Sequence, residues 1–153
     1  MLIEPGSNIK DYVCGNTDRT ARPGFIFRRR DSASMTVPSV SSVRTLAADV
    51  RDGNRSSVDL VEGSLDRIEA TSELNAFITV LEGRARERAR EIDAAIARGE
   101  DPGPLCGVPV AIKDLGSRKE GVRHTLGLEQ LAGNVAASDS IDVERLEAAG
   151  AVV

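Results

Sequence analysis

A lysine–aspartate pair at the end of a short apolar run is the part of this sequence best suited to chemistry. The run 108–112, Val-Pro-Val-Ala-Ile, follows a Pro/Gly-rich turn and predicts a short buried strand that ends at Lys113 and Asp114. Open α/β sheets usually keep their chemistry outside the carboxyl ends of their strands. A lysine there becomes a base near neutral pH when burial or nearby positive charge destabilises its ammonium group. From the spacing alone, however, Lys113 is better interpreted as an exposed lysine whose stem covers the sheet edge.

Other polar side chains near this pair have simpler interpretations than catalysis. Asp114 either orients Lys113 or caps the following turn, and capping is the better interpretation. Cys106 and His124 are the residue types that a thiol hydrolase needs, but nothing in their spacing places them together. A single cysteine beside a strand is usually a small core residue, and we predict that role for Cys106.

The residues around the pair resemble a known family. The block Gly-Val-Pro-Val-Ala-Ile-Lys-Asp at 107–114, preceded by Pro-Leu, is similar to the first conserved block of the amidase signature family. Similar stretches follow at 121–127 and 143–153, so the resemblance covers about residues 43–153. It implies that Lys113 is the base of a serine–cis-serine–lysine triad that hydrolyses or transfers amides. The resemblance therefore reverses the interpretation from spacing alone.

The resemblance gives the neighbouring residues lesser roles. Gly107 and Pro109 are predicted to be structural, because they permit close backbone approach and an irregular sheet edge. His124 and Thr125 lie in a loop that, in the family, helps to shape the mouth of the active site. A solvent-facing role for these two residues is an equally good interpretation.

The sequence also departs from the family pattern. In the family, the serine nucleophile, the bridging serine and the oxyanion-hole amides lie in a Gly/Ser-rich stretch downstream of the lysine. Serines of this chain that are predicted to open helices cannot replace them: Ser56, Ser57, Ser138 and Ser140. Leu115 and Leu128 stand where many members have asparagine and serine. With Lys113 as the only triad member, the polypeptide by itself is expected to be inactive.

Three functions are compatible with this pattern. The first is an amidase that hydrolyses a small-molecule carboxamide to the acid and ammonia. The second is the glutamine-hydrolysing A subunit of a tRNA-dependent amidotransferase. Leu115 favours the first, because those subunits usually have asparagine there. The third is a non-catalytic truncated remnant that folds poorly or binds through its helices. The expected protein partners are a second copy of the chain or amidotransferase subunits.

Composition argues against several other classes. The formal net charge of −4 and the pI near 5.1 argue against direct nucleic-acid binding. Cys14 and Cys106 are too few for a disulfide framework, and with a single histidine they make no convincing metal site. We therefore expect neither a metal nor a cofactor. No apolar run approaches the roughly 20 residues that span a bilayer, so we expect a cytoplasmic protein without a membrane partner.

Apolar periodicity and capping residues predict the elements that position the pair. In chain order we expect a helical hairpin at 43–53 and 56–68, a strand at 74–80, a helix at 82–98, a strand at 108–112, a loop at 116–134 with a short helix at 128–131, a helix at 139–150 and a strand at 151–153. Ser56 and Asp59 form a capping box. In the long helix, Glu82 pairs with Arg86, the remaining charges face water, and small alanines suit packing on a sheet.

This order predicts an α/β fold, with an N-terminal helical hairpin followed by βαβ units of a parallel or mixed sheet. Residues 1–34 lack periodicity and are predicted to be a disordered extension, with Met35 the better candidate for the initiator. Their basic run 28–30 is interpreted as solvated charge and not as a docking patch. Residues 35–153 are then the N-terminal portion of an amidase signature domain. Because the chain ends within a predicted buried strand, we expect it to be truncated part-way through that fold.

Overall fold

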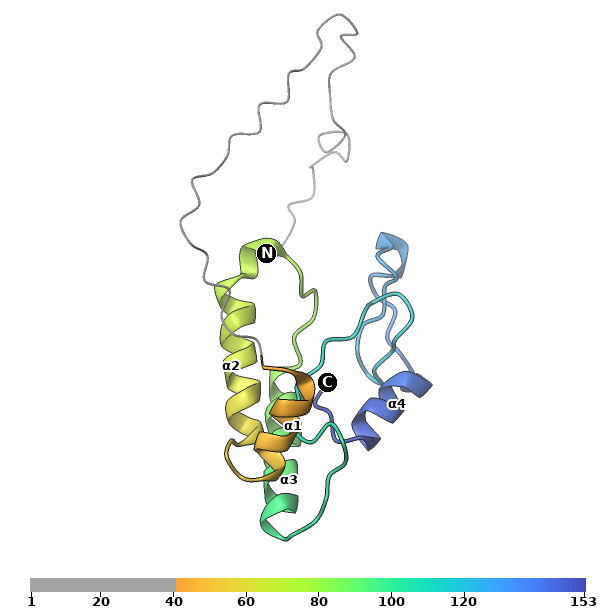
Figure 1. Cartoon of the computed structure of the whole chain (residues 1–153). Helices are drawn as coiled ribbons and strands as arrows, with labels where there is room; N and C mark the ends of the chain where they lie inside the picture. Colours follow the sequence, from red (N-terminus) through yellow and green to blue (C-terminus); the bar gives the residue numbers. More distant parts are fainter. Residues whose placement is uncertain (1–40) are drawn as a thin grey trace, which may run out of the picture. The chain divides into compact units, whose positions relative to one another are not determined.

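The computed structural model of this protein describes residues 41–153, so the predictions for residues 1–34 and for Met35 lie outside it. The described residues form four α-helices and two short 3₁₀-helices, shown in Figure 1. In chain order these are α1 (Val43–Arg51), α2 (Ser57–Ala70), η2 (Ser72–Leu74), α3 (Glu82–Ala97), η3 (Glu129–Leu131) and α4 (Ile141–Ala148). Along residues 41–153, no helix combines the length and the apolarity needed to cross a bilayer.

Serine hydroxyl groups start the first two helices. Ser42 Oγ accepts a hydrogen bond from the Thr45 amide at 3.1 Å before α1, and Ser56 Oγ accepts from the Asp59 amide at 2.9 Å before α2. These bonds satisfy amides that have no partner inside the helix. They confirm the two predicted helices and the serine half of the predicted capping box, while the helix that packs most closely on α2 is α3.

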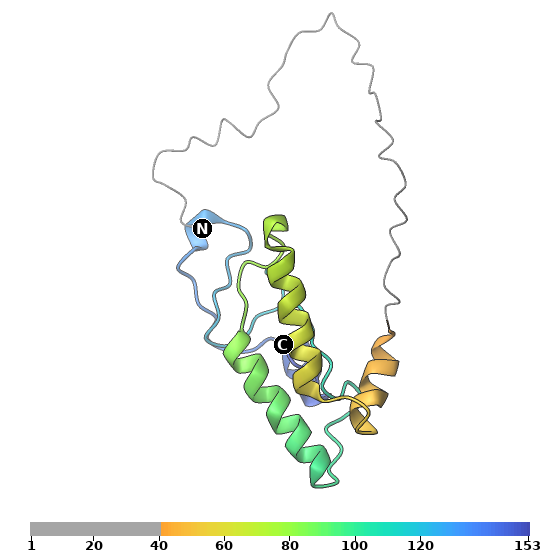
Figure 2. The ribbon, with the colours of Figure 1, turned by 90° about the vertical axis from the view of Figure 1, so that its left-hand side faces the viewer.

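Helices α2 and α3 lie side by side and are also joined through polar side chains, as Figures 1 and 2 show. Asp93 on α3 accepts hydrogen bonds from the amides of Ser57 at 2.7 Å and Val58 at 3.2 Å, at the start of α2. Arg86 on α3 pairs with Glu82 at 3.0 Å, as predicted, and also with Glu62 of α2 at 2.8 Å. The prediction that the other charges of α3 face water is wrong for Asp93, because the start of α2 needs its carboxylate.

Asp93→Ala is expected to lower the free energy of unfolding by about 1–2 kcal/mol, because it removes the acceptor for two amides at the start of α2. Glu87→Ala is the matched control. Glu87 is exposed on the same helix and makes no hydrogen bond or ion pair with the residues described, so its loss should cost less than about 0.5 kcal/mol. Urea denaturation of both variants measures the difference. Equal costs would contradict the capping role of Asp93.

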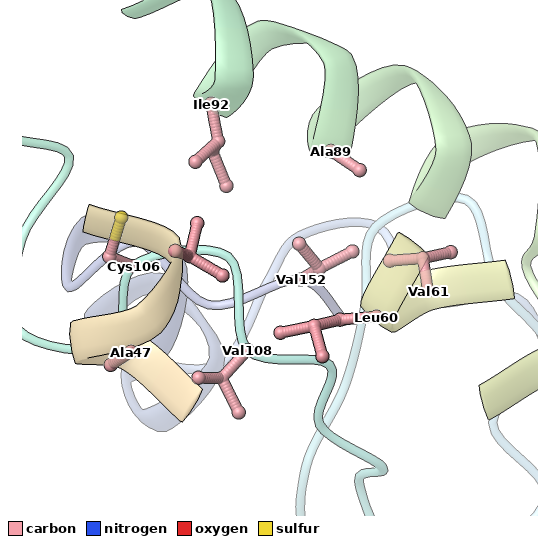
Figure 3. Packing of buried hydrophobic residues seen from close by; sticks show 9 residues of the cluster. Ala47, Leu60, Val61, Ala89, Ile92, Cys106, Val108 and Val152 are labelled. Atoms are coloured by element: carbon pink, nitrogen blue, oxygen red, sulfur yellow. The ribbon is translucent and has the colours of Figure 1, made fainter. Parts of the chain in front are cut away.

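One apolar core joins α1, α2 and α3 to two later segments, one at Cys106 and Val108 and one at Val152 (Figure 3). Its buried members are Ala47, Val50, Leu60, Val61, Ala89, Ile92, Cys106, Val108 and Val152. Cys106 is fully buried there, which confirms the prediction of a small core residue, and burial raises the pKa of its thiol. A Cβ on Gly107 would lie 2.7 Å from the hydroxyl oxygen of Ser57, which confirms the predicted close backbone approach.

Of the three predicted strands, only those at 108–112 and 151–153 pair with each other, and they do so at a single bridge. No strand is found within residues 41–153, but Pro109 and Val152 form an isolated parallel bridge. Val110 N donates to Val152 O at 2.7 Å, and Val152 N donates to Val108 O at 3.0 Å. Pro109 itself takes no part in these two bonds, and because it has no amide hydrogen it cannot donate to a strand on its other side. The two segments thus pair in the predicted direction, while the predicted βαβ units are not confirmed.

The strand predicted over 74–80 is absent. Its first residue belongs to η2, Asn75 has a φ of +50°, and Phe77 and Ile78 are 45% and 56% exposed. β-branched and aromatic residues favour a strand only where a neighbouring strand pairs with them, and the described structure offers this segment none. Ala85 and Ala89 of α3, which were predicted to pack on a sheet, pack instead on the apolar core that α3 shares with α2.

Two glycines allow the segments around the Pro109–Val152 bridge to approach each other closely. Gly103 has a φ of +113°, and a Cβ there would lie 2.6 Å from Ala149 O. Gly150 has a φ of +89°, and a Cβ there would lie 2.5 Å from Pro102 O. No side chain larger than hydrogen fits either contact without a backbone shift. Gly150 also follows Ala149, the C-cap residue of α4, where the helix predicted over 139–150 was expected to end.

Candidate active site

Lys113 lies just after the extended segment that pairs with Val152. Its side chain is exposed and forms no hydrogen bond or ion pair with any residue from 41 to 153. It lines a cavity of about 400 Å³. The structure therefore places the candidate base at a hollow in the surface.

The cavity has one apolar wall and one cationic wall. The apolar wall includes Phe77, Ile78 and Ile112. The other wall carries Lys113 and three basic residues that lie later in the sequence: Arg118, Lys119 and Arg123. Such a surface suits a ligand with an apolar body and a polar head.

Lys119 is the one cation of this wall that has carboxylate partners among the residues described. Its Nζ lies 2.8 Å from Asp139 and 2.9 Å from Glu147, and its side chain is 17% exposed. Burial disfavours its charged form, but the hydrogen bonds to the two carboxylates outweigh burial and raise the pKa of Lys119. This network ties the loop after Lys113 to α4, and the sequence pattern did not reveal it.

Asp114 binds Thr125, eleven residues further along the chain. Its carboxylate accepts from the Thr125 amide at 2.8 and 3.1 Å, and from the Thr125 hydroxyl. The hydroxyl hydrogen bond is the main reason that the pKa of Asp114 is lowered. The predicted capping role is therefore found at a later turn, the one that begins at Thr125, because Leu128 N donates to Thr125 O at 2.9 Å.

Acid is expected to release this contact. Because folding lowers the pKa of Asp114, its contribution to stability is fully present above the ordinary aspartate value of about 4 and is lost as pH falls through the lower folded value. An NMR titration from pH 6 to pH 2 should show the Thr125 amide signal moving below about pH 4. Asp114→Asn should remove that transition. A transition that persists in this variant would show that another acid, such as Asp139, controls the loop.

His124 lies beside the same carboxylate. Its Nε2 is 4.0 Å from Asp114 Oδ1 and has no hydrogen-bond partner among the residues described, and its side chain is only 13% exposed. Its backbone is fixed because His124 N donates to Asn134 O at 2.9 Å. The solvent-facing interpretation is therefore wrong for His124. Cys106 belongs to the core and not to the cavity lining, so the structure does not support a thiol hydrolase.

Three of the four serines that are predicted to open helices have structural partners, and Ser138 has none among the residues described. Ser56 caps α2, as predicted, and Ser57 Oγ donates to Gly107 O at 3.3 Å. Ser140 is the N-cap residue of α4 and accepts from the Arg118 amide at 2.9 Å. Ser117 also lines the Lys113 cavity, a placement that the sequence did not suggest, but its hydroxyl donates to Asp142.

Known proteins similar to this chain share one family. The family described as "Amidase" matches residues 59–153. The A subunit of the glutamyl-tRNA(Gln) amidotransferase of Anaeromyxobacter dehalogenans (strain 2CP-C) is 52% identical over 99 residues, covering 64% of this chain and 20% of that protein. The corresponding protein of Carboxydothermus hydrogenoformans is 41% identical over 112 residues, covering 72% of this chain and 23% of that protein. The chain thus spans about a fifth to a quarter of the length of these relatives.

Solved structures agree with the sequence relatives. A bacterial aryl acylamidase of the amidase signature enzymes has a TM-score of 0.69 and 29% identity, covering 73% of this chain and 24% of that one. A structure described as "An unexpected vestigial protein complex reveals the evolutionary origins of an s-triazine catabolic enzyme" has a TM-score of 0.69 and 38% identity, covering 73% of this chain and 25% of that one. Nearly three-quarters of this chain is thus similar in sequence and fold to each of these structures. The chain belongs to the amidase signature family.

Proposed function

We propose that the protein containing this chain hydrolyses a carboxamide to the acid and ammonia, with Lys113 as the base of a serine–cis-serine–lysine triad. The observation that carries this proposal is the position of Lys113, at the end of a paired segment and at the edge of a cavity, within the residues that match the family. Residues 35–153 then form the N-terminal portion of the amidase signature domain. In the complete domain, the paired segments around Pro109 and Val152 become neighbouring parallel strands of its sheet.

The proposed chemistry needs a neutral amine and two hydroxyl groups. The Lys113 amine takes a proton, relayed through the bridging serine, from the nucleophilic serine, whose oxygen attacks the amide carbon. The carbon–nitrogen bond then breaks, the nitrogen leaves as ammonia with the returned proton, and water releases the acid. Lys113 is exposed within the described residues, whereas a neutral amine requires burial or like charge nearby. Both the serines and the cover over Lys113 are therefore expected from the rest of the enzyme.

A second candidate is the glutamine-hydrolysing component of an amidotransferase. The observation that favours it is the 52% identity to the A subunit of a glutamyl-tRNA(Gln) amidotransferase, against 29% to the aryl acylamidase. Leu115 favours the simple amidase, because asparagine is usual at this position in the amidotransferase. A neighbouring gene for a partner protein would support the amidotransferase. A preference for small carboxamides over glutamine would support the amidase.

Two experiments test the proposal. The coding sequence beyond the codon for Val153 is expected to continue with a Gly-Lys-Thr-Asn-like stretch and then a Gly/Ser-rich block. In addition, the matching residues of this chain can replace the aligned segment of the amidotransferase relative from Anaeromyxobacter dehalogenans. This hybrid, assayed with its partner subunits, should release ammonia from glutamine, and Lys113→Ala should abolish the release. A folded hybrid that never releases ammonia would favour the non-catalytic remnant instead.

A further inference from the structure

The backbone at Lys113 makes a sharp turn whose central residue is Asp114. Leu115 N donates a hydrogen bond to Lys113 O at 2.8 Å, which closes a three-residue turn. A side chain leaves the backbone in a direction set by the local dihedral angles. The direction of the Lys113 side chain therefore depends on whether this turn stays closed.

The side chain at the centre of the turn is held from outside the turn. The Asp114 carboxylate accepts from both the amide and the hydroxyl of Thr125. Hydrogen bonds to an ionised acceptor are roughly twice as strong as neutral ones. His124 Nε2, at 4.0 Å, is beyond hydrogen-bond distance, so the short hydrogen bonds to the carboxylate come from Thr125.

The loop that carries Thr125 is itself fixed. Arg123 and Val135 form an antiparallel bridge, and Ala136 N donates to Val122 O at 2.9 Å. The Asn134 side chain donates to His124 O at 2.8 Å. These bonds make residues 122–125 a rigid anchor, so that a restraint placed on Asp114 is transmitted to the turn and not absorbed by the loop.

We propose that Asp114 is a positioning residue for Lys113: through Thr125 it keeps the 113–115 turn closed and holds the lysine side chain at the cavity. The functional meaning rests on the proposed role of Lys113 as a base. The alternative is that the Asp114–Thr125 contact only closes the loop between them, with no effect on the lysine. The two accounts differ in what happens at Lys113 and Leu115 when the contact is broken.

Thr125→Val in the full 153-residue chain is the main test, because it removes the hydroxyl donor and leaves the charge of Asp114 in place. Hydrogen exchange of the Leu115 amide should become about tenfold faster, since losing a hydrogen bond to a charged group shifts the opening equilibrium by about that factor. Thr125→Ser should restore the original rate. Ser117→Ala is the matched control, because it removes a hydroxyl bond to Asp142 from the same loop and should leave Leu115 unchanged.

Acetylation of individual lysines, followed by mass spectrometry, supplies the second readout. The Lys113 side chain is already exposed, so opening the turn changes its surroundings and not its access to reagent. Its labelling relative to Lys119 should therefore depart from the original ratio in Thr125→Val and return to that ratio in Thr125→Ser. Faster exchange confined to residues 122–128, with Leu115 exchange and Lys113 labelling unchanged, would overturn the proposal. Neither readout needs turnover. An active Lys113→Ala hybrid would therefore refute the proposed function while leaving this contact testable.

Discussion

Lys113→Arg should lower the kcat of the ammonia-releasing hybrid enzyme by about 10⁴-fold or more. Removing one member of a nucleophile–base unit costs about as much activity as removing all of them. Arginine keeps the positive charge and the long stem, but its guanidinium group stays protonated in proteins and cannot accept a proton. The measurement is ammonia release under saturating substrate. The loss should appear in kcat and not in KM, since the base acts on the reacting groups and not on substrate binding.

Lys119→Arg is the matched control for this experiment. It makes the same chemical change six positions away in the same cavity wall, and it retains a cation for Asp139 and Glu147. Its turnover should stay within about threefold of the parent hybrid, since arginine can keep both ion pairs. Equal losses in the two variants would indicate that the cavity needs lysine stems in general. Undiminished turnover in Lys113→Arg would show that the base is another group.

Gly150→Ala should destabilise the fold by about 3–5 kcal/mol, which is enough to unfold a marginal domain. Two costs add at this position. A non-glycine residue at φ of +89° is strained, and its Cβ would lie 2.5 Å from Pro102 O, so the backbone must move. Urea denaturation gives the free energy of unfolding, and loss of soluble folded protein would be the extreme result.

Gly99→Ala separates these two costs. Gly99 follows α3 with a φ of +77°, yet a Cβ there meets nothing within 4 Å. Only the backbone strain remains, so the expected cost is about 1–2 kcal/mol. Similar losses in the two variants would mean that the 102–107 and 149–152 segments can separate cheaply. That result would contradict the close contact on which the parallel bridge depends.

The helices of this protein were predictable because their determinants are local. Helix α1 follows from an apolar period of three to four residues and a nearby glycine, and the serine cap of α2 lies three residues from the amide that it satisfies. The polar role of Asp93 was not predictable, because its partners lie 35 and 36 residues away on another helix. A charged residue on a charged helix carries no sequence signal that distinguishes it from its solvent-facing neighbours.

Strand prediction failed for the same physical reason. The residues at 74–80 have strand-like types, but a strand also needs a partner, and pairing is set by distant parts of the chain. At 108–112 the direction of pairing was predictable from the helix that separates it from Val152, although the length of the ladder was not. A local sequence pattern indicates which conformation a segment favours, and contacts with distant parts of the chain decide whether the segment adopts it.

The candidate site was predictable only in part. A family-like block singles out Lys113, and the same resemblance draws attention to the loop with His124 and Thr125. The hydrogen bonds between Asp114 and Thr125 were not foreseen, since eleven residues of irregular loop separate the two and no period relates them. Prediction from spacing therefore located the amine, while the structure was needed to find what holds the residue beside it.

Val152 shares one core with Ala47, although more than a hundred residues of chain separate them. During synthesis, Ala47 is added to the chain before Val152. The residues of α1, α2 and α3 have therefore all been synthesised long before Val152 leaves the ribosomal exit tunnel. During that interval the apolar sides of these helices lack one of their packing partners. Contacts between such distant parts of a chain form slowly, because a long loop must close before they stabilise anything. The nascent helices must therefore stay in solution, or be held by a chaperone, until synthesis of the segment that completes their core.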